Sequence, residues 1–384
     1  MRVALVANVS PQANPYITLF QQAVQPYCAE PVPLVARLTP GWALRQARPG
    51  GIVHVHWVES QIRPQPWFGA SAAGYRRLIY KLGHNRLVHP ARMAGELGRL
   101  ALALALARRA GARLVYTLHN LEPNFGAGYS AGLAEAAHRL ILAGADAIHV
   151  HSQAAARAVA ARYGRRRAVF VVPHGHYIGQ YPNRLSPAEA RARLGLAPAD
   201  FVALALGQIA PYKGLESLLA AQAELGPAAL KLVIAGKVAH AEYGAQIAAL
   251  AQGPGVLYRP GFVPDDELQV YLNAADVVAL PYARSTTSGS ALLALSFGRP
   301  VVAPALDYLA EVVPPLAGVL YPPAAAGGLT AALRQARATD WSAAAILAHA
   351  RQYDWRAIGA QMAEIYQAAL GAAGTPLVSE GRSA

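Results

Sequence analysis

Short apolar runs recur along the whole chain, and longer segments that favour helix separate them. A continuous apolar run indicates a strand buried on both faces, and strands that alternate with helices indicate a parallel sheet covered on both sides. Five runs fall in the first half and five in the second: residues 2–9, 51–58, 113–119, 147–152 and 168–175, then 201–209, 230–236, 255–262, 277–282 and 300–304. The pattern predicts an α/β chain with two Rossmann-like domains.

The joint between the two series lies in the stretch VPHGHYIGQYPNRLSPAEARARLGL, which is rich in Gly, Pro, Tyr and Asn. Because this composition is typical of a connection between domains, we expect a first domain over residues 1–178 and a second over 179–354. The last strong helical pattern covers residues 354–370, and a polar tail follows it. We expect residues 377–384 to be frayed.

Size and composition favour two cores in a protein that does not cross a membrane. The chain has 384 residues, 54% of them apolar, which is more than one ordinary core accommodates. Its longest apolar run, LALALALA at 100–107, is far short of the roughly 20 residues that a span needs. The first residues read as a strand and not as a leader, and the single cysteine, Cys28, suits a reducing compartment. We expect a cytoplasmic location.

The charge is uneven along the chain. The formal net charge is +13, and residues 1–175 hold 20 Lys and Arg against 6 Asp and Glu, whereas the remainder holds 14 against 15. A basic surface favours anionic partners, which include phosphate-bearing ligands, nucleic acid and anionic membranes. The chain lacks the basic and aromatic interleaving of the usual nucleic-acid modules, so we expect no nucleic-acid partner.

Candidate ligand-binding residues follow the strands of the second half, because doubly wound sheets bind ligands beyond the carboxyl ends of their strands. The run Ser285–Ser290 is the most distinctive, since it places five hydroxyls and Gly289 before an apolar helix expected from about Ala291. Free N–H groups at a helix start and small hydroxyl residues suit a diphosphate, although one of these residues could simply cap the helix. Other candidates are Gln208, Lys213, Lys237, Phe262, Val263 and, further on, Glu311, which could equally cap a segment.

The stretches GQIAPYKGLESLL, LVIAGK, GFVPDDELQVYLNAADVVALPY and SFGRPVVAPALDYLAEVV, in this order, resemble the donor-binding half of GT-B glycosyltransferases of the family 4 type. In the first half NPYITLFQQAV, VHVHWVES, YTLHNLEPN and VPHGHYIGQYP resemble the exopolysaccharide-type members. The resemblance implies two domains that face a cleft, with a final helix over residues 355–376 that crosses back to the first domain. It also implies a nucleotide diphosphate sugar as co-substrate.

The resemblance assigns roles to individual residues. Lys213 would bind the donor phosphates, the strand end at Phe262 and Val263 would hold the base, and Thr287, Ser288, Gly289 and Ser290 would receive the diphosphate. The sequence departs from the family at three places. Gln208 stands where many members carry arginine, Ser285 and Leu293 stand where many carry glutamates, and SPQANPY replaces the usual glycine pair in the first loop.

Transfer of a sugar requires that the acceptor hydroxyl lose its proton as it attacks and that the leaving diphosphate be neutralised. An inverting enzyme uses a protein base for the proton, whereas a retaining one can use the donor phosphate, and the sequence leaves both mechanisms open. His119 at the end of the run RLVYTLH is the first candidate base, because histidine titrates near neutrality, and Glu122 follows it. His56, Glu59, Asn14 and His174 are further candidates for the cleft. The alternative for each histidine is a buried packing residue. Ser152 reads as a helix cap.

No metal or other cofactor is expected, because the chain has no D-x-D pair at a strand end and no Cys/His ligand spacing. The cationic and amphipathic segment from Gly74 to Arg92 suggests contact with an anionic membrane, or alternatively a solvated helix face. We therefore predict a bacterial glycosyltransferase that uses a UDP- or GDP-sugar and a glycan or lipid-linked acceptor in surface-polysaccharide synthesis. A nucleotide-sugar epimerase and a non-catalytic binder of anionic ligands are the alternatives.

Overall fold

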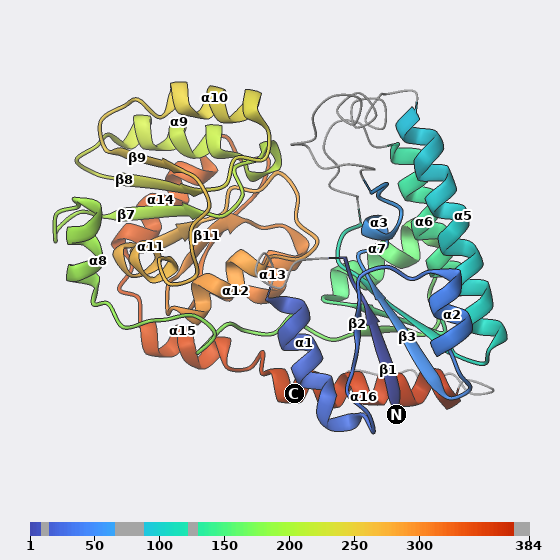
Figure 1. Cartoon of the computed structure of the whole chain (residues 1–384). Coiled ribbons are helices and arrows are strands. Elements are labelled where there is room, and N and C mark those ends of the chain that lie inside the picture. The colour runs from blue at the N-terminus through green and yellow to red at the C-terminus, as the bar shows by residue number, and fades with distance from the viewer. Residues whose placement is uncertain (9–14, 66–87, 122–129, 372–384) are drawn as a thin grey trace. The chain divides into compact units, whose positions relative to one another are not determined.

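Two six-stranded parallel sheets form the framework of the chain (Figure 1). The computed structural model describes residues 1–8, 15–65, 88–121 and 130–371. Contacts divide the chain into unit 1, which is Met1–Pro173 with the segment from Trp355 onward, and unit 2, which is His174–Asp354. Each unit carries one of the sheets.

The sheet of unit 1 has the order β2-β1-β3-β4-β5-β6, and all its pairs are parallel. Its direction of winding reverses between β1 and β3, which is the place where this topology binds ligands. Its strands are β1 Arg2–Val6, β2 Leu34–Val35, β3 Gly51–His56, β4 Arg113–Leu118, β5 Ala147–Val150 and β6 Val169–Val171. Its helices are α1 Tyr16–Val24, η1 Gln25–Tyr27, α2 Pro40–Gln46, α3 Val58–Gln61, α5 Val88–Arg109, α6 Ala131–Gly144, α7 Gln153–Tyr163 and α16 Trp355–Gly371.

The two faces of this sheet differ in character. One face packs apolar side chains such as Val53, Val55 and Tyr116 against α5, α6 and α7. The opposite face lies under α1 and α16 and carries both apolar and polar residues. Helices α1 and α16 approach very closely, since a Cβ atom at Gly359 would lie 2.1 Å from the carbonyl oxygen of Ala23. The last helix therefore completes the core of unit 1.

The sheet of unit 2 has the order β12-β11-β10-β7-β8-β9, which is the Rossmann order with the reversal between β7 and β10. Its strands are β7 Val202–Leu206, β8 Lys231–Gly236, β9 Val256–Pro260, β10 Val277–Ala279, β11 Val301–Pro304 and β12 Gly318–Tyr321. Its helices are α8 Pro187–Leu194, η2 Pro211–Lys213, α9 Leu215–Leu225, α10 Ala241–Leu250, α11 Leu268–Ala274, α12 Gly289–Ser296, α13 Asp307–Val312, α14 Gly328–Ala338 and α15 Ala343–Ala350.

Helices α9, α10 and α14 cover one face of this sheet and enclose an apolar core (Figure 1). The inner strands of both sheets are buried on both faces, as the continuous apolar runs predicted, whereas the edge strands are only partly buried. The predicted fold class is confirmed: the chain is α/β with two Rossmann-like units, and its last helix packs on the first unit. Among the described residues, no helix combines the length and the apolar character required of a membrane span.

Two details differ from the sequence-based expectation. Residues 174–178 belong to unit 2 and not to the first domain, because the Tyr177 amide donates to Ser296 Oγ (2.9 Å) and the His176 amide donates to the Tyr353 carbonyl (2.9 Å). Helix α12 starts at Gly289, two residues before the expected start, because Ser288 caps it by accepting a hydrogen bond from the Ala291 amide (3.2 Å). The tail beyond residue 371 lies outside the described residues.

Candidate functional site

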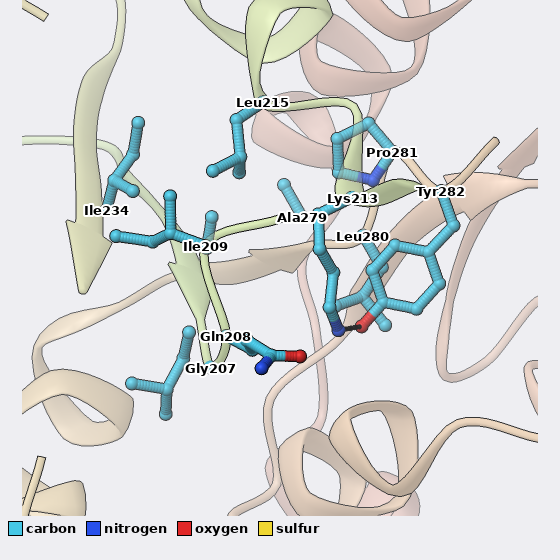
Figure 2. A pocket seen from close by; sticks show the side chains of 12 residues that line it. Gly207, Gln208, Ile209, Lys213, Leu215, Ile234, Ala279, Leu280, Pro281 and Tyr282 are labelled. Atoms are coloured by element: carbon cyan, nitrogen blue, oxygen red, sulfur yellow. Dashed lines mark hydrogen bonds between the residues drawn. The ribbon is translucent and has the colours of Figure 1, made fainter. Parts of the chain in front are cut away.

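A pocket lies at the reversal point of the unit 2 sheet, beyond the ends of β7 and β10 (Figure 2). Glycines shape the strand ends here, since Gly207, Gly236 and Gly261 all have φ between 118° and 149°, a region that side-chain-bearing residues avoid. A Cβ at Gly236 would lie 1.7 Å from the Gly207 carbonyl oxygen. The strand ends can therefore approach one another only because they lack side chains. The pocket is lined by Ala205, Leu206, Gly207, Gln208, Ile209, Lys213, Leu215, Ile234, Ala279, Leu280, Pro281 and Tyr282.

Lys213 is the one charged residue among those that line this pocket in the described chain. Its ammonium donates a hydrogen bond to Tyr282 Oη (2.7 Å; Figure 2) and lies 4.2 Å from the centre of the Tyr282 ring. The Tyr212 ring is 5.2 Å away. Burial by itself would lower the pKa of Lys213, but the two tyrosines outweigh it and raise that pKa. The site therefore keeps a positive charge, which suits an anionic ligand.

The hydroxyl-rich segment lies near Tyr282, the residue that Lys213 contacts. The side chains of Ser290 and Ser288 lie near the Tyr282 hydroxyl. Burial alone would raise the pKa of Tyr282, but the Lys213 ammonium and these two hydroxyls lower it. Ser285 Oγ and Thr287 Oγ1 are buried and have no hydrogen-bond partner within the described chain. Buried hydroxyls that lack a protein partner can serve a bound ligand.

His174 packs against the start of α12. A Cβ at Gly289 would lie 3.1 Å from Tyr177 Oη and 3.9 Å from His174 Nε2, so both side chains pack closely against this glycine. His174 Nδ1–H donates to the Gly175 carbonyl (2.8 Å), and Nε2 accepts from Tyr177 Oη (3.4 Å). Burial lowers the pKa of His174 to about 4, so this imidazole is neutral at pH 7. The structure thus places His174 next to the predicted diphosphate segment.

The remaining predicted donor residues lie further out on unit 2. Gln208 lines the pocket and is exposed, and Lys237 is exposed at the end of β8. Phe262 is 65% exposed and Val263 is partly buried, both just after β9. Glu311 is exposed near the end of α13, and its charge acts on Tyr353, whose pKa is raised first by burial and then by this carboxylate. It does not line the pocket.

Unit 1 brings five histidines together on the sheet face that α1 and α16 cover. They are His54 and His56 of β3, His119 just after β4, His149 of β5 and His151 just after β5, and each is at most 6% exposed. A chain of hydrogen bonds links several of them. His54 Nδ1 lies 2.8 Å from Tyr366 Oη and its Nε2 2.7 Å from Thr117 Oγ1, which lies 2.9 Å from His149 Nδ1. His149 Nε2 lies 2.9 Å from the Val172 carbonyl.

When the imidazoles are neutral, the donor and acceptor of each hydrogen bond in this series follow from its last group, the Val172 carbonyl. A carbonyl only accepts, so His149 Nε2 is the donor and His149 Nδ1 accepts from the Thr117 hydroxyl. Thr117 then accepts from His54 Nε2–H, and His54 Nδ1 accepts from Tyr366 Oη–H. Each proton has one acceptor, which makes this buried network a rigid support for the residues beside it.

His119 and His56 form a second pair on this face. His56 Nδ1 lies 3.1 Å from His119 Nε2, and the His119 ring stacks on Trp57 with centres 3.9 Å apart and planes 9° apart. Trp57 has φ +47°, a left-handed conformation that is strained for a bulky residue. Tyr16 of α1 meets His119 edge-on at 5.0 Å. His119 therefore has a defined orientation at the end of β4.

Glu59 is not part of this group. It lies on α3 at the other face of the sheet, where its Oε2 is 3.7 Å from His138 Nε2 and its Oε1 is 3.5 Å from Asn120 Nδ2. Glu122, Asn14 and the part of the Gly74-to-Arg92 segment before residue 88 lie outside the described residues.

Sequence reasoning missed Tyr282 and Trp57. Tyr282 ends the run VVALPY, so the strand-end rule that selected Lys213 could also have found it. For Trp57 there was no signal, because positive φ and ring stacking are visible only in the fold. In the described part of the chain, no three His, Cys, Asp or Glu side chains are arranged to hold a metal ion.

We expect unit 1 to lose stability in acid. Burial lowers the pKa of His54 and His56 well below 6.5, and neighbouring histidines lower it further. Below pH 6.5 the unfolded chain binds protons that the folded chain excludes, so stability is complete above this pH and falls below it. Two such groups give a slope of about 2.7 kcal/mol per pH unit. Urea unfolding between pH 5 and 8, with hydrogen exchange followed on β3 peptides, measures it.

His54→Gln provides the matched test, because glutamine keeps one donor and one acceptor but does not titrate. The slope should fall by about 1.4 kcal/mol per pH unit, the value for one proton. His240→Gln, which replaces an exposed histidine of unit 2, should leave it unchanged. A slope in the His54 variant equal to that of the unmodified protein would contradict this account.

Two segments of the chain match known protein families. Residues 33–177 match the family described as Glycosyltransferase Family 4, and residues 200–338 match the family described as Glycosyl transferases group 1. A GDP-mannose:glycolipid 4-beta-D-mannosyltransferase of Xanthomonas campestris pv. campestris is 28% identical over 379 residues, which cover 96% of this chain and 92% of that protein. A D-inositol 3-phosphate glycosyltransferase of Segniliparus rotundus is 30% identical over 300 residues, covering 72% and 65%.

Solved structures share the fold at lower identity. HepE of Anabaena, in complex with UDP and glucose, has a TM-score of 0.63 and 21% identity, with 95% of this chain and 99% of that chain covered. Sucrose-phosphate synthase of Thermosynechococcus elongatus has a TM-score of 0.64 and 18% identity, with 96% and 98% covered. At this level of identity the likeness concerns the fold.

Proposed function

The chain is a GT-B glycosyltransferase of the family 4 type, and from this premise we propose that it transfers a hexose from a UDP- or GDP-sugar to a hydroxyl group of a glycan or lipid-linked acceptor. One observation carries the donor side of the proposal. Lys213, Tyr282 and the hydroxyls of Ser288 and Ser290 meet at the reversal point of the unit 2 sheet.

In this proposal the donor diphosphate lies against Lys213 and the start of α12. The ammonium and the free N–H groups of the helix neutralise the charge that grows on the diphosphate as the bond to the sugar breaks. Ser285 and Thr287 offer further hydroxyls. The strand end at Phe262 and Val263 would hold the base. We propose that the reaction needs no metal, because these groups can stabilise the leaving diphosphate.

His119 is the proposed base. It would take the proton of the acceptor hydroxyl while the oxygen attacks the anomeric carbon of the sugar, and the electrons of the broken bond would leave with the diphosphate. His56 and Trp57 fix the orientation of its ring, as a base requires. A protein base of this kind belongs to an inverting mechanism, and the name of the Xanthomonas relative specifies a β-linked product.

The relative that spans nearly the whole chain suggests the first substrates to try. Its name describes GDP-mannose as donor and a glycolipid as acceptor. A lipid-linked acceptor also agrees with the surplus of Lys and Arg in residues 1–175, because cations favour an anionic membrane surface. We propose that the protein works at the inner face of the plasma membrane, in surface-polysaccharide synthesis.

Transfer to a lipid-linked acceptor tests the proposal directly. The purified chain is incubated with radiolabelled GDP-mannose or UDP-glucose, membranes as the source of acceptor, and EDTA. We expect label in the lipid fraction with one donor, undiminished by EDTA, and the anomeric configuration of the product follows from NMR. If no UDP- or GDP-sugar transfers its label to another molecule, the proposed donor class is wrong.

A further inference from the structure

Tyr282 lies between the two parts of the proposed diphosphate site. It is 6% exposed, and its hydroxyl accepts a hydrogen bond from Lys213 (2.7 Å), while the side chains of Ser290 and Ser288 lie near this hydroxyl. Ser288 is also the residue that caps α12. The phenol oxygen thus connects the ammonium to the start of the helix.

The backbone around Tyr282 is joined to the turn that carries Lys213. The Ala283 amide donates to the Tyr212 carbonyl (3.0 Å). Gly214 has φ +63°, and a Cβ there would lie 2.1 Å from the Pro281 carbonyl oxygen. The end of β10 and the Lys213 turn therefore form one packed unit, in which the Tyr282 side chain has a set position relative to Lys213.

A flexible lysine needs such a partner in order to act as a fixed charge. Its side chain carries about 2 kcal/mol of rotamer entropy, which a ligand must otherwise remove. Many members of the family that the sequence resembles carry an arginine at the position of the uncharged Gln208. Lys213 is therefore the one charged residue among the described residues that line this pocket. Fixing it in advance lowers the entropic cost of binding a diphosphate.

We propose that Tyr282 is the positioning residue of the donor site: it holds the Lys213 ammonium and aligns it with Ser288 and Ser290, so that one diphosphate meets the cation and the hydroxyls together. The inference rests on the proposed binding of a nucleoside diphosphate at Lys213. Tyr282 acts through Lys213, and it stabilises the bound diphosphate only while that ammonium is present.

A double-mutant cycle tests this dependence. Calorimetry measures the Kd of GDP and of UDP for Tyr282→Phe, Lys213→Ala and the variant with both changes, and melting temperatures without nucleotide report their folding. For the nucleotide that binds, we expect Tyr282→Phe to raise Kd about 10-fold and Lys213→Ala about 100-fold, the range of hydrogen bonds to charged groups. The double variant should match Lys213→Ala within about 2-fold, because the two changes act through the same group.

Each outcome decides between the two proposals. If the double variant binds about 10-fold more weakly than Lys213→Ala, Tyr282 acts independently of the lysine and the inference is wrong. If Lys213→Ala weakens binding but Tyr282→Phe does not, the inference fails while the diphosphate site stands. If Lys213→Ala binds both nucleotides normally, both fail. Comparison of the double variant with Lys213→Ala remains decisive even where Tyr282→Phe alone is unstable.

Tyr321→Phe is the matched control. Tyr321 belongs to the edge strand β12 of the same unit and does not line the pocket. Removing its hydroxyl should leave the Kd of both nucleotides unchanged, which separates a role at the site from the general effect of losing a phenol group.

Discussion

Lys213→Ala is expected to lower kcat/KM for the nucleotide sugar about 1000-fold, within the range of removing a donor group that stabilises developing negative charge. The physical reason is that Lys213 is the charge that lines the strand-end pocket of unit 2, where neighbouring tyrosines raise its pKa and keep it protonated. Part of the loss should appear as weaker binding of the donor and part as a lower kcat, since the diphosphate gains charge as the sugar leaves. Steady-state kinetics with varied donor measures both.

Lys231→Ala is the control for this prediction. Lys231 starts β8, at the opposite end of the strand from the pocket, and its ammonium is 4.0 Å from Asp200 Oδ1. A surface pair of this kind contributes less than about 1 kcal/mol, so the kinetic constants should remain within about 2-fold of those of the unmodified protein. Equal kcat/KM values for the two lysine variants would remove Lys213 from the donor site.

His119→Gln is expected to lower kcat about 10²- to 10⁴-fold with little change in the KM of the donor, because general-base catalysis contributes that factor. Glutamine can keep a hydrogen bond to His56 and much of the packing on Trp57, yet it cannot accept the acceptor proton as a base. A residue needed only for packing would tolerate this change. Initial rates at saturating donor and acceptor measure the effect, and the melting temperature reports folding.

Chemical rescue distinguishes a base from a structural residue at position 119. His119→Ala leaves space beside Trp57, and added imidazole should restore part of kcat in a concentration-dependent way. His89→Ala, which removes another buried histidine of unit 1 on α5, should show neither the loss nor the rescue. Full activity of His119→Gln would show that another group accepts the proton.

The two units obtain their candidate sites from the same geometric rule. In unit 2 the residues of interest follow β7 and β10, the two strands at the reversal of winding, and in unit 1 they follow β3, which borders the reversal, and its neighbour β4. Parallel strands all end at the same edge, so side chains far apart in sequence meet there. This explains how Lys213 reaches Tyr282 across 69 positions and how His56 reaches His119 across 63.

The sequence alone determined the class of fold and where to search. Continuous apolar runs separated by helical segments required two parallel sheets, because such strands must be covered on both faces, and the strand ends then pointed to Lys213, to the hydroxyl segment and to His119. These features depend on local pattern and on general rules of chain topology.

Only the tertiary structure decided which of these residues meet and through what. The link of Lys213 to the α12 start through Tyr282, the place of His174 beside Gly289 and the separation of Glu59 from His56 all depend on side-chain direction and packing between distant segments. So does the strained Trp57 that stacks on His119. Local propensity does not encode such contacts, because each arises from the joint packing of several strands and helices.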